Sequence, residues 1–159
     1  MAAKKAYKRT MYRETGGTFG SPTFNLVDNV KDVAANPQKD QLEGTTRRSG
    51  KVKEYEPGRI DLTVTGMMEV DESNEDFTAF ETAWLADSSL DIMILDGTSA
   101  TNGSRGYRME MKLFAFSEET ADDGILYRSF ELRPCISSNA KQSVVVSSGA
   151  PVFTTLANN

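Results

Sequence analysis

The chain has 159 residues, of which 38% are hydrophobic and 26% charged, and its formal net charge is −5. This length supports one hydrophobic core and is short for two, and no apolar run reaches the length of a membrane span. The absence of histidine and the single cysteine, Cys135, exclude an intrachain disulfide and His/Cys metal sites, remove the commonest general base, and fit a reducing compartment. The first ten residues, MAAKKAYKRT, lack the apolar core of a signal peptide.

Positive and negative charges are unevenly distributed along the chain. Residues 1–59 contain 12 Lys and Arg against 7 Asp and Glu, a net of +5, whereas residues 60–159 contain 6 against 16, a net of −10. This split is typical of a nucleic-acid-binding arm on an acidic body, or of copies that associate through oppositely charged faces. A basic arm that is merely solvated is the third interpretation.

Residues 1–26 are expected to form an extended basic arm followed by a loop. Five Lys and Arg residues precede the first acid, Glu14, and the segment GGTFGSP at residues 16–22 disfavours regular structure. Basic residues interleaved with aromatic ones can bind single-stranded nucleic acid, although such arms more often dock on a neighbouring subunit.

Residues 26–48 are predicted to form a hairpin whose turn is Asn36–Asp40. The segment Ser49–Gly58, SGKVKEYEPG, follows as a charged loop whose length packing does not explain, which indicates a functional or mobile segment. Residues 60–70 then alternate strictly between apolar and polar side chains, apart from Met67 on the polar face. This pattern predicts a strand with one buried face and one face of threonines and acids.

The segment Ser73–Gly97 predicts the one substantial helix and a strand that follows it. Ser73 and Asn74 are good N-cap residues, and Phe77, Phe80 and Trp84 recur at helical spacing, so we expect these three rings to be buried against the sheets. Leu90 to Leu95 is apolar on both faces, which predicts a fully buried strand.

The rest of the chain is predicted to be β structure. Residues 107–116 and 125–136 form strands joined by an acidic turn at 118–124, residues 144–146 form a short strand, and 147–159 is a C-terminal tail. The turn lacks the EF-hand pattern, and the loop at 98–106 lacks the phosphate-binding GxxxxGK[ST] pattern. The predicted fold is mainly β, a sandwich or barrel over residues 27–146 with one flanking α-helix.

The order of these segments resembles that of bacteriophage tail tube (major tail) proteins. The resemblance covers roughly Val27 to Arg133 and rests on TTRR at 45–48, the long alternating strand, FTAFETAWL, IMILDG, and the hairpin GYRMEMKLFAFS/GILYRSFELRP. The long basic N-terminal arm departs from the family pattern.

The resemblance implies a structural, non-enzymatic subunit of the virion tail. Hexameric rings would stack into a hollow tube through which genome DNA passes without specific binding, and a wet strand face of threonines and acids suits such a channel. The partners would be other copies of the chain and the tail tip or baseplate, tape-measure and tail terminator proteins, with no cofactor, metal or membrane. No motif assigns the interfaces. The candidate contacts are residues of the arm, of the TTRR segment and of the charged loop: Lys8, Arg9, Arg47, Arg48, Lys51, Lys53 and Tyr55.

Four alternatives remain open. The nearest is a tube subunit of a contractile injection or type VI-like secretion system, whose fold is similar. A small nucleic-acid-binding module is suggested by the basic arm and opposed by the sequence pI of about 4.8. A sugar-binding sandwich would need an exposed aromatic platform, and an enzyme would need a Ser/Lys or paired-carboxylate site.

Overall fold

A computed structural model describes residues 9–44, 50–120 and 124–157. Over these residues the chain forms nine strands and one helix. Their bounds are β1 (Thr10–Thr18), β2 (Ser21–Leu26), β3 (Val30–Glu43), β4 (Tyr55–Glu69), α1 (Glu75–Ala86), β5 (Leu90–Leu95), β6 (Arg105–Thr120), β7 (Leu126–Pro134), β8 (Gln142–Ser147) and β9 (Ala150–Thr155).

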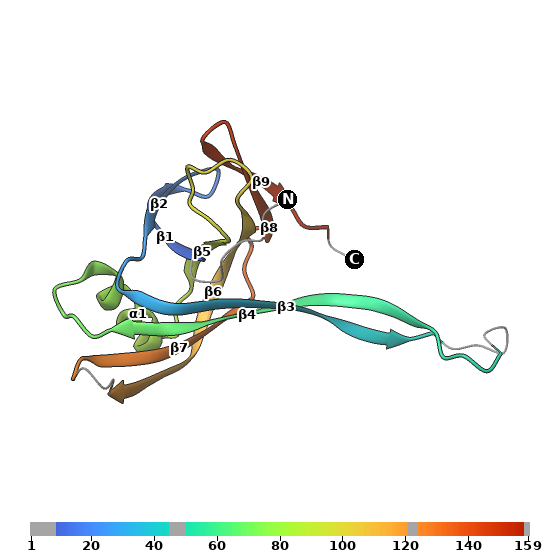
Figure 1. Cartoon of the computed structure of the whole chain (residues 1–159), viewed down its shortest axis with the longest axis horizontal. Helices are drawn as coiled ribbons and strands as arrows, with labels where there is room; N and C mark the ends of the chain where they lie inside the picture. The colour runs from blue at the N-terminus through green and yellow to red at the C-terminus, as the bar shows by residue number, and fades with distance from the viewer. Residues whose placement is uncertain (1–8, 45–49, 121–123, 158–159) are drawn as a thin grey trace.

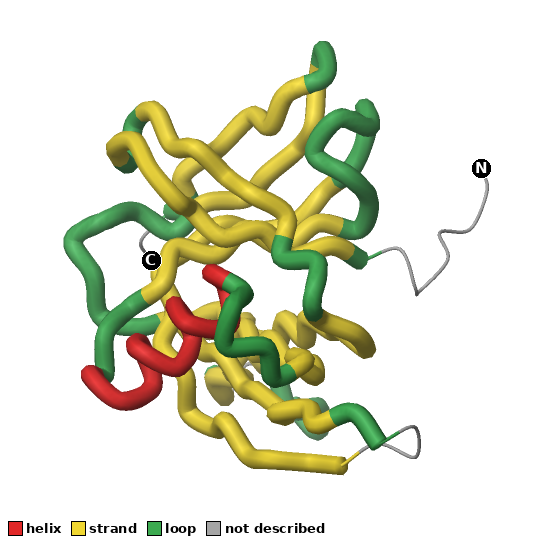
Figure 2. The backbone as a smooth tube through the Cα atoms, turned by 90° about the vertical axis from the view of Figure 1, so that its left-hand side faces the viewer, coloured by secondary structure: helices red, strands yellow, loops and turns green. Residues whose placement is uncertain are grey.

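The long strand β6 joins two groups of antiparallel strands. Its first half pairs with β5 on one side and with β8 on the other, and its second half pairs with β7. The full order is β2-β1-β5-β6-β7-β4-β3, with β9 added outside β8. A register shift between Leu113 and Ala115 interrupts the pairing of β6 with β7, and such a bulge bends a strand. The strands therefore form an upper and a lower group, with α1 beside the lower one (Figure 2). The predicted mainly β fold with one flanking helix is confirmed.

Helix α1 begins and ends as its sequence predicts. The Asn74 side chain accepts hydrogen bonds from the amides of Asp76 and Phe77, which satisfies two of the free N–H groups of the first turn. At the other end Asp87 adopts a left-handed conformation and its amide bonds back to the carbonyl of Ala83, a common helix terminus.

The buried face of α1 differs from the prediction in one residue. Phe77 and Phe80 are buried as expected, and Phe80 meets Phe130 edge to face at 5.5 Å between ring centroids. Trp84 is 37% exposed, so its predicted burial is wrong. The buried stripe follows the spacing 77, 80, 83 and is completed by Ala83, which leaves Trp84 at its border with its indole against the Phe116 ring.

Strand β5 separates two hydrophobic clusters, as its two apolar faces predict. Ile92 and Ile94 belong to the larger cluster, which includes the buried face of α1. Met93 and Leu95 belong to the smaller one, between β1, β8 and β9. Both faces of β5 are therefore covered by other elements.

The extended arm predicted over residues 1–26 is wrong for residues 10–26, which form the hairpin β1–β2. Strand β1 adds to the edge of β5, so Met11 and Tyr12 are buried. Arg13, one of the basic residues of the expected arm, pairs with Asp76 at 2.8 Å. The predicted tail likewise contains a strand, because Ala150–Thr155 pairs with β8.

The predicted turn at Asn36–Asp40 is also wrong. These residues continue strand β3, with Asn36 opposite Thr63 and Gln38 opposite Asp61. β3 is the last strand of the sheet order, and an edge strand tolerates Pro37, which has no N–H to donate. The hairpin therefore closes beyond Glu43 and Tyr55, and part of the expected loop Ser49–Gly58 belongs to β4.

Candidate subunit interface

Among the described residues, no third strand pairs with the outer half of the β3–β4 hairpin. β7 pairs with β4 only from Val64 to Glu69. We call the remaining part, Asn36–Glu43 paired with Tyr55–Thr63, the outer ribbon. It projects away from the body of the molecule (Figure 1). Because an isolated two-stranded hairpin is marginally stable in water, the outer ribbon is a segment that another surface would stabilise.

Large apolar side chains are exposed at the far end of the outer ribbon. Leu42, Val52 and Tyr55 have exposed fractions of 58%, 69% and 52%. Single exposed apolar residues are common on protein surfaces, but three of them at the end of one projecting hairpin indicate a contact surface.

The predicted contact residues fall into three groups. Lys51, Lys53 and Tyr55 lie together at the end of the outer ribbon and are exposed. Lys53 lies 4.0 Å from Glu43, an exposed pair that contributes little stability. Arg9 directly precedes β1, which pairs with β5 in the body, so it is not part of the outer ribbon. Lys8, Arg47 and Arg48 lie outside the described residues.

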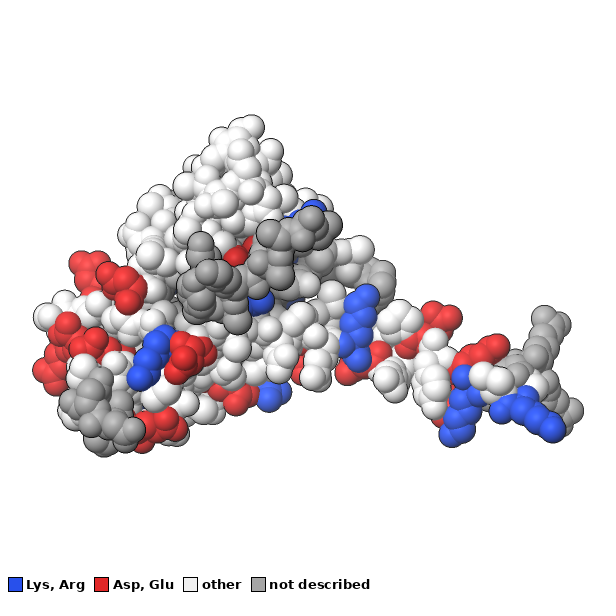
Figure 3. Space-filling model, viewed as in Figure 1, with Lys and Arg blue, Asp and Glu red and all other residues white. Residues whose placement is uncertain are grey.

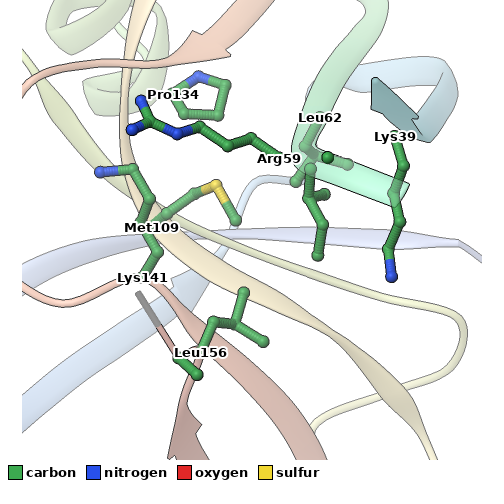
Figure 4. Close-up of a pocket in the computed structure, with 10 residues that line it drawn as sticks. Lys39, Arg59, Leu62, Met109, Pro134, Lys141 and Leu156 are labelled. Atoms are coloured by element: carbon green, nitrogen blue, oxygen red, sulfur yellow. The ribbon is translucent and has the colours of Figure 1, made fainter. Parts of the chain in front are cut away.

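A groove of about 470 Å³ lies where the outer ribbon meets the body. Its cationic side chains are Lys39 and Arg59 of the ribbon and Lys141, which precedes β8; its apolar ones include Leu62, Met109 and Leu156 (Figure 4). Sequence reasoning missed this groove, because its residues are far apart in the chain and none belongs to a motif.

The cations of the groove have no carboxylate partner among the described residues. Lys141 donates a hydrogen bond from Nζ to the carbonyl oxygen of Cys135, 3.2 Å away. Neither Lys39 nor Arg59 has an ion pair in the described part of the chain. Burial raises the pKa of the thiol of Cys135, which follows the groove residue Pro134.

The face of β4, β7 and β6 that points away from α1 carries half-buried and exposed side chains, and we call it the uncovered face. Cross-strand rows on this face contain Thr65, Glu131 and Ala115, and next to them Met67, Ser129 and Ser117. The predicted alternation of the strand at 60–70 is confirmed from Leu62 onward, since Leu62, Val64 and Met68 on the opposite face are fully buried. It is wrong for Ile60, which is 39% exposed.

The charge split of the sequence corresponds only in part to a split in space. Acidic side chains gather at the end of the body that carries α1, whereas acidic and basic side chains are mixed on the outer ribbon (Figure 3). Near its end, Lys51 and Lys53 are neighbours in sequence of Glu54 and Glu56. At the acidic end, hydrogen bonds from the Ser73 hydroxyl and amide lower the pKa of Asp71. The acidic residues around α1 and at the adjoining end of β6 include Asp71, Glu72, Glu75, Glu118 and Glu119.

Two classes of functional feature were also sought in the described ranges. No group of three or more potential metal-ligating side chains occurs there. No helix in the part of the chain that the structure describes is long and apolar enough to cross a membrane.

The fold resembles solved structures of tubular tail assemblies. No protein-family model and no curated protein matches the sequence. A chain from the tail of an empty gene transfer agent particle, refined with C6 symmetry, aligns with a TM-score of 0.66 at 10% identity, over 96% of this chain and 100% of that one. The SPP1 tail tube aligns with a TM-score of 0.64 at 8% identity, over 98% of this chain and 81% of that one.

A contractile-type assembly also has this fold. A chain of the anti-feeding prophage baseplate, symmetrised sixfold, aligns with a TM-score of 0.53 at 10% identity, over 92% of this chain and 99% of that one. At these identities the comparisons establish the fold, and they agree with the order of segments read from the sequence. The chain has the fold of tail tube proteins, which is related to that of contractile injection systems.

Proposed function

We propose that this protein is the structural subunit of a phage-type tail tube, in which hexameric rings stack around a channel for DNA. The observation that carries the proposal is the outer ribbon, which has no third strand and exposes Leu42, Val52 and Tyr55. The likeness in fold to a sixfold-symmetric tail and to a tail tube supports it. Contacts between unlike surfaces of identical subunits close into rings when the rotation between subunits is suitable.

The uncovered face of β4, β7 and β6 is suited to line the channel. Its carboxylates Glu69, Glu119 and Glu131 repel phosphates, and its threonines and serines offer only neutral polar groups. Two of its cations are engaged within the chain: Arg133 pairs with Glu131 at 2.6 Å, which raises the pKa of Arg133, and Lys31 lies over the Tyr127 ring. Lys112, opposite Arg133, adds one further positive charge. DNA held through few free cations would slide instead of binding.

The same proposal assigns partners and location. The tube would occupy the virion tail and end on a tail tip or baseplate at one side and on a terminator at the other, with a tape-measure protein inside during assembly. Genome DNA would pass without specific binding, and the subunit would need neither a cofactor nor catalytic residues. We expect the outer ribbon and the cationic groove to make the contacts with these partners or with other copies.

A tube subunit of a contractile injection system is the second candidate. The likeness to the anti-feeding prophage baseplate favours it. In that case the channel would carry a protein cargo, and the content of purified particles would distinguish the two. A nucleic-acid-binding module has less support, because Arg13 is engaged by Asp76 and residues 10–26 are strands of the body.

Negative-stain electron microscopy of the concentrated protein tests the proposal. We expect hollow tubes of stacked rings, formed spontaneously or on addition of tail-tip seeds. Monodisperse single subunits at every concentration, with and without seeds, would overturn the tail-tube proposal. Retention of labelled DNA by the unassembled protein at physiological salt would favour the nucleic-acid-binding module instead.

A further inference from the structure

We infer that the groove at the base of the outer ribbon is a binding site for a small amphipathic anion, a free molecule with one apolar chain and a phosphate ester as its head group. The inference goes beyond the proposed function, because it concerns the single subunit and assigns a ligand to it. It rests on cations that lie beside an apolar floor and have no carboxylate partner among the described residues.

Two cations meet at one side of the groove. The charged ends of Arg59 and Lys141 point to the same side, whereas the Lys39 side chain lies at the other (Figure 4). In the described ranges none of the three has a carboxylate within ion-pair distance. Like charges that the fold brings together repel each other, so an anion that enters between them is attracted by both. Because the guanidinium of arginine matches the geometry of phosphate oxygens, a phosphate ester is the head group that suits this side.

The chain itself holds Lys141 in position. Its Nζ donates a hydrogen bond to the carbonyl oxygen of Cys135, 3.2 Å away. The loop that contains both residues is fixed by the Glu110 carboxylate, which accepts hydrogen bonds from the Ser137 hydroxyl and, at 2.8 Å, from the Asn139 amide. An ammonium has three N–H donors, so one bond to a neutral carbonyl leaves its charge and two donors for a ligand. A cation that is already positioned loses less side-chain entropy when an anion binds.

The floor of the groove is apolar. Leu62 and Met109 are buried core residues, Ile60 beside them is 39% exposed, and Leu156 is half-buried. The volume of about 470 Å³ lies in the range of small-molecule sites, which are mostly apolar with a few charged groups that fix the orientation of the ligand. A ligand that fills the groove therefore needs an apolar chain for the floor as well as a negative charge for the cations.

Isothermal titration calorimetry with decyl phosphate tests the site. The protein is kept unassembled, because we also expect the groove to contact other copies in tubes, and decyl phosphate stays below its critical micelle concentration. We expect one molecule to bind per chain. Arg59→Glu should weaken binding at least about tenfold, since one of the two converging cations becomes an anion. Ile60→Asn should also weaken it, because the floor becomes polar.

Matched controls separate the groove from the rest of the surface. Arg105→Glu and Val145→Asn make the same changes at exposed positions outside the groove and should leave the affinity unchanged. All four variants should keep the urea denaturation midpoint of the parent. Inorganic phosphate lacks the chain and decyl maltoside lacks the charge, so each should bind at least about tenfold more weakly than decyl phosphate.

Four results would overturn the inference. They are no binding of decyl phosphate, equal binding of decyl maltoside, equal binding of inorganic phosphate, and an affinity that Arg59→Glu leaves unchanged. Two further measurements identify another occupant. Retention of the protein on phosphatidylglycerol vesicles, lost in Arg59→Glu, would assign the groove to a membrane surface. Self-association that Arg59→Glu abolishes, without binding of decyl phosphate, would assign it to a second copy. Because all titrations use unassembled protein, their failure leaves the tail-tube proposal intact.

Discussion

Arg108 is the residue on which the second hydrophobic cluster depends. Its side chain is 1% exposed, and its guanidinium lies 2.7 Å from the Asp91 carboxylate and donates to the carbonyl of Phe19 and the side chain of Gln142. Three aromatic rings surround it at 4.3 to 5.1 Å from their centroids, those of Phe19, Phe24 and Phe153. One side chain thus holds the β1–β2 turn against β5, β8 and β9.

Replacing Arg108 with Met should lower the free energy of unfolding by about 3–5 kcal/mol, because Asp91 would keep a buried charge without its partner. Urea denaturation measures the loss. The double variant Arg108→Met/Asp91→Leu removes both charges and should recover most of it. Arg105→Met, at an exposed position on the same strand, should change stability by less than about 0.5 kcal/mol. An Arg108→Met protein as stable as the parent would show that the ion pair contributes nothing.

The sequence does not reveal this role of Arg108. Within β6, Arg108 alternates with Tyr107 and Met109, which predicts a half-buried strand with its charged residues in water. The face of β6 that carries Arg108 is instead covered by β8, β9 and the β1–β2 turn, which are distant in sequence. Alternation identifies which side chains share a face, and only the tertiary arrangement decides whether both faces are buried.

At the scale of elements, α1 offers a direct comparison of two aromatic residues. Phe80→Ala should cost about 3–5 kcal/mol, because Phe80 is fully buried between Phe116 and Phe130. Trp84→Ala should cost less than about 2 kcal/mol, since its indole is partly in solvent and meets one ring. Thermal or urea unfolding of both variants checks this order, and a larger loss for Trp84→Ala would contradict the packing described above.

The outer ribbon is the element expected to matter for assembly and not for folding. Lys39 and Ile60 are paired, so residues 40–59 can be replaced by Asn-Gly, which favours a tight hairpin turn. The shortened protein should unfold within about 1 kcal/mol of the parent, because the removed residues touch no core. It should form no tubes under conditions in which the parent does. If the shortened protein formed tubes of normal length, the outer ribbon would not be an assembly contact.

Elements with a strong local signal were predictable, and those that depend on distant partners were not. The capped helix at 75–86 and the doubly apolar strand at 90–95 follow from periodicity and N-cap chemistry alone. Asn36–Asp40 has the composition of a turn but continues an edge strand, because β4 offers it a partner along its whole length. Of the candidate contacts, the exposed end at Lys51, Lys53 and Tyr55 was found from composition, whereas the groove required the fold.

For the molecule as a whole, the two ends differ in shape. One end is a body with α1 and an acidic surface, and the other is the projecting outer ribbon, whose surface carries both acidic and basic side chains (Figures 1 and 3). A subunit with unlike ends associates in one direction, so growth by addition of identical copies would give a polar tube. The groove lies between the two ends, where the outer ribbon meets the body.

A cryo-electron microscopy reconstruction of tubes assembled from the purified protein tests the central claim most directly. The account predicts six subunits in each ring, the face with Thr65 and Ser129 turned toward the channel, and each outer ribbon resting on another copy. Rings of a different number, or a ribbon that contacts no other copy, would contradict it.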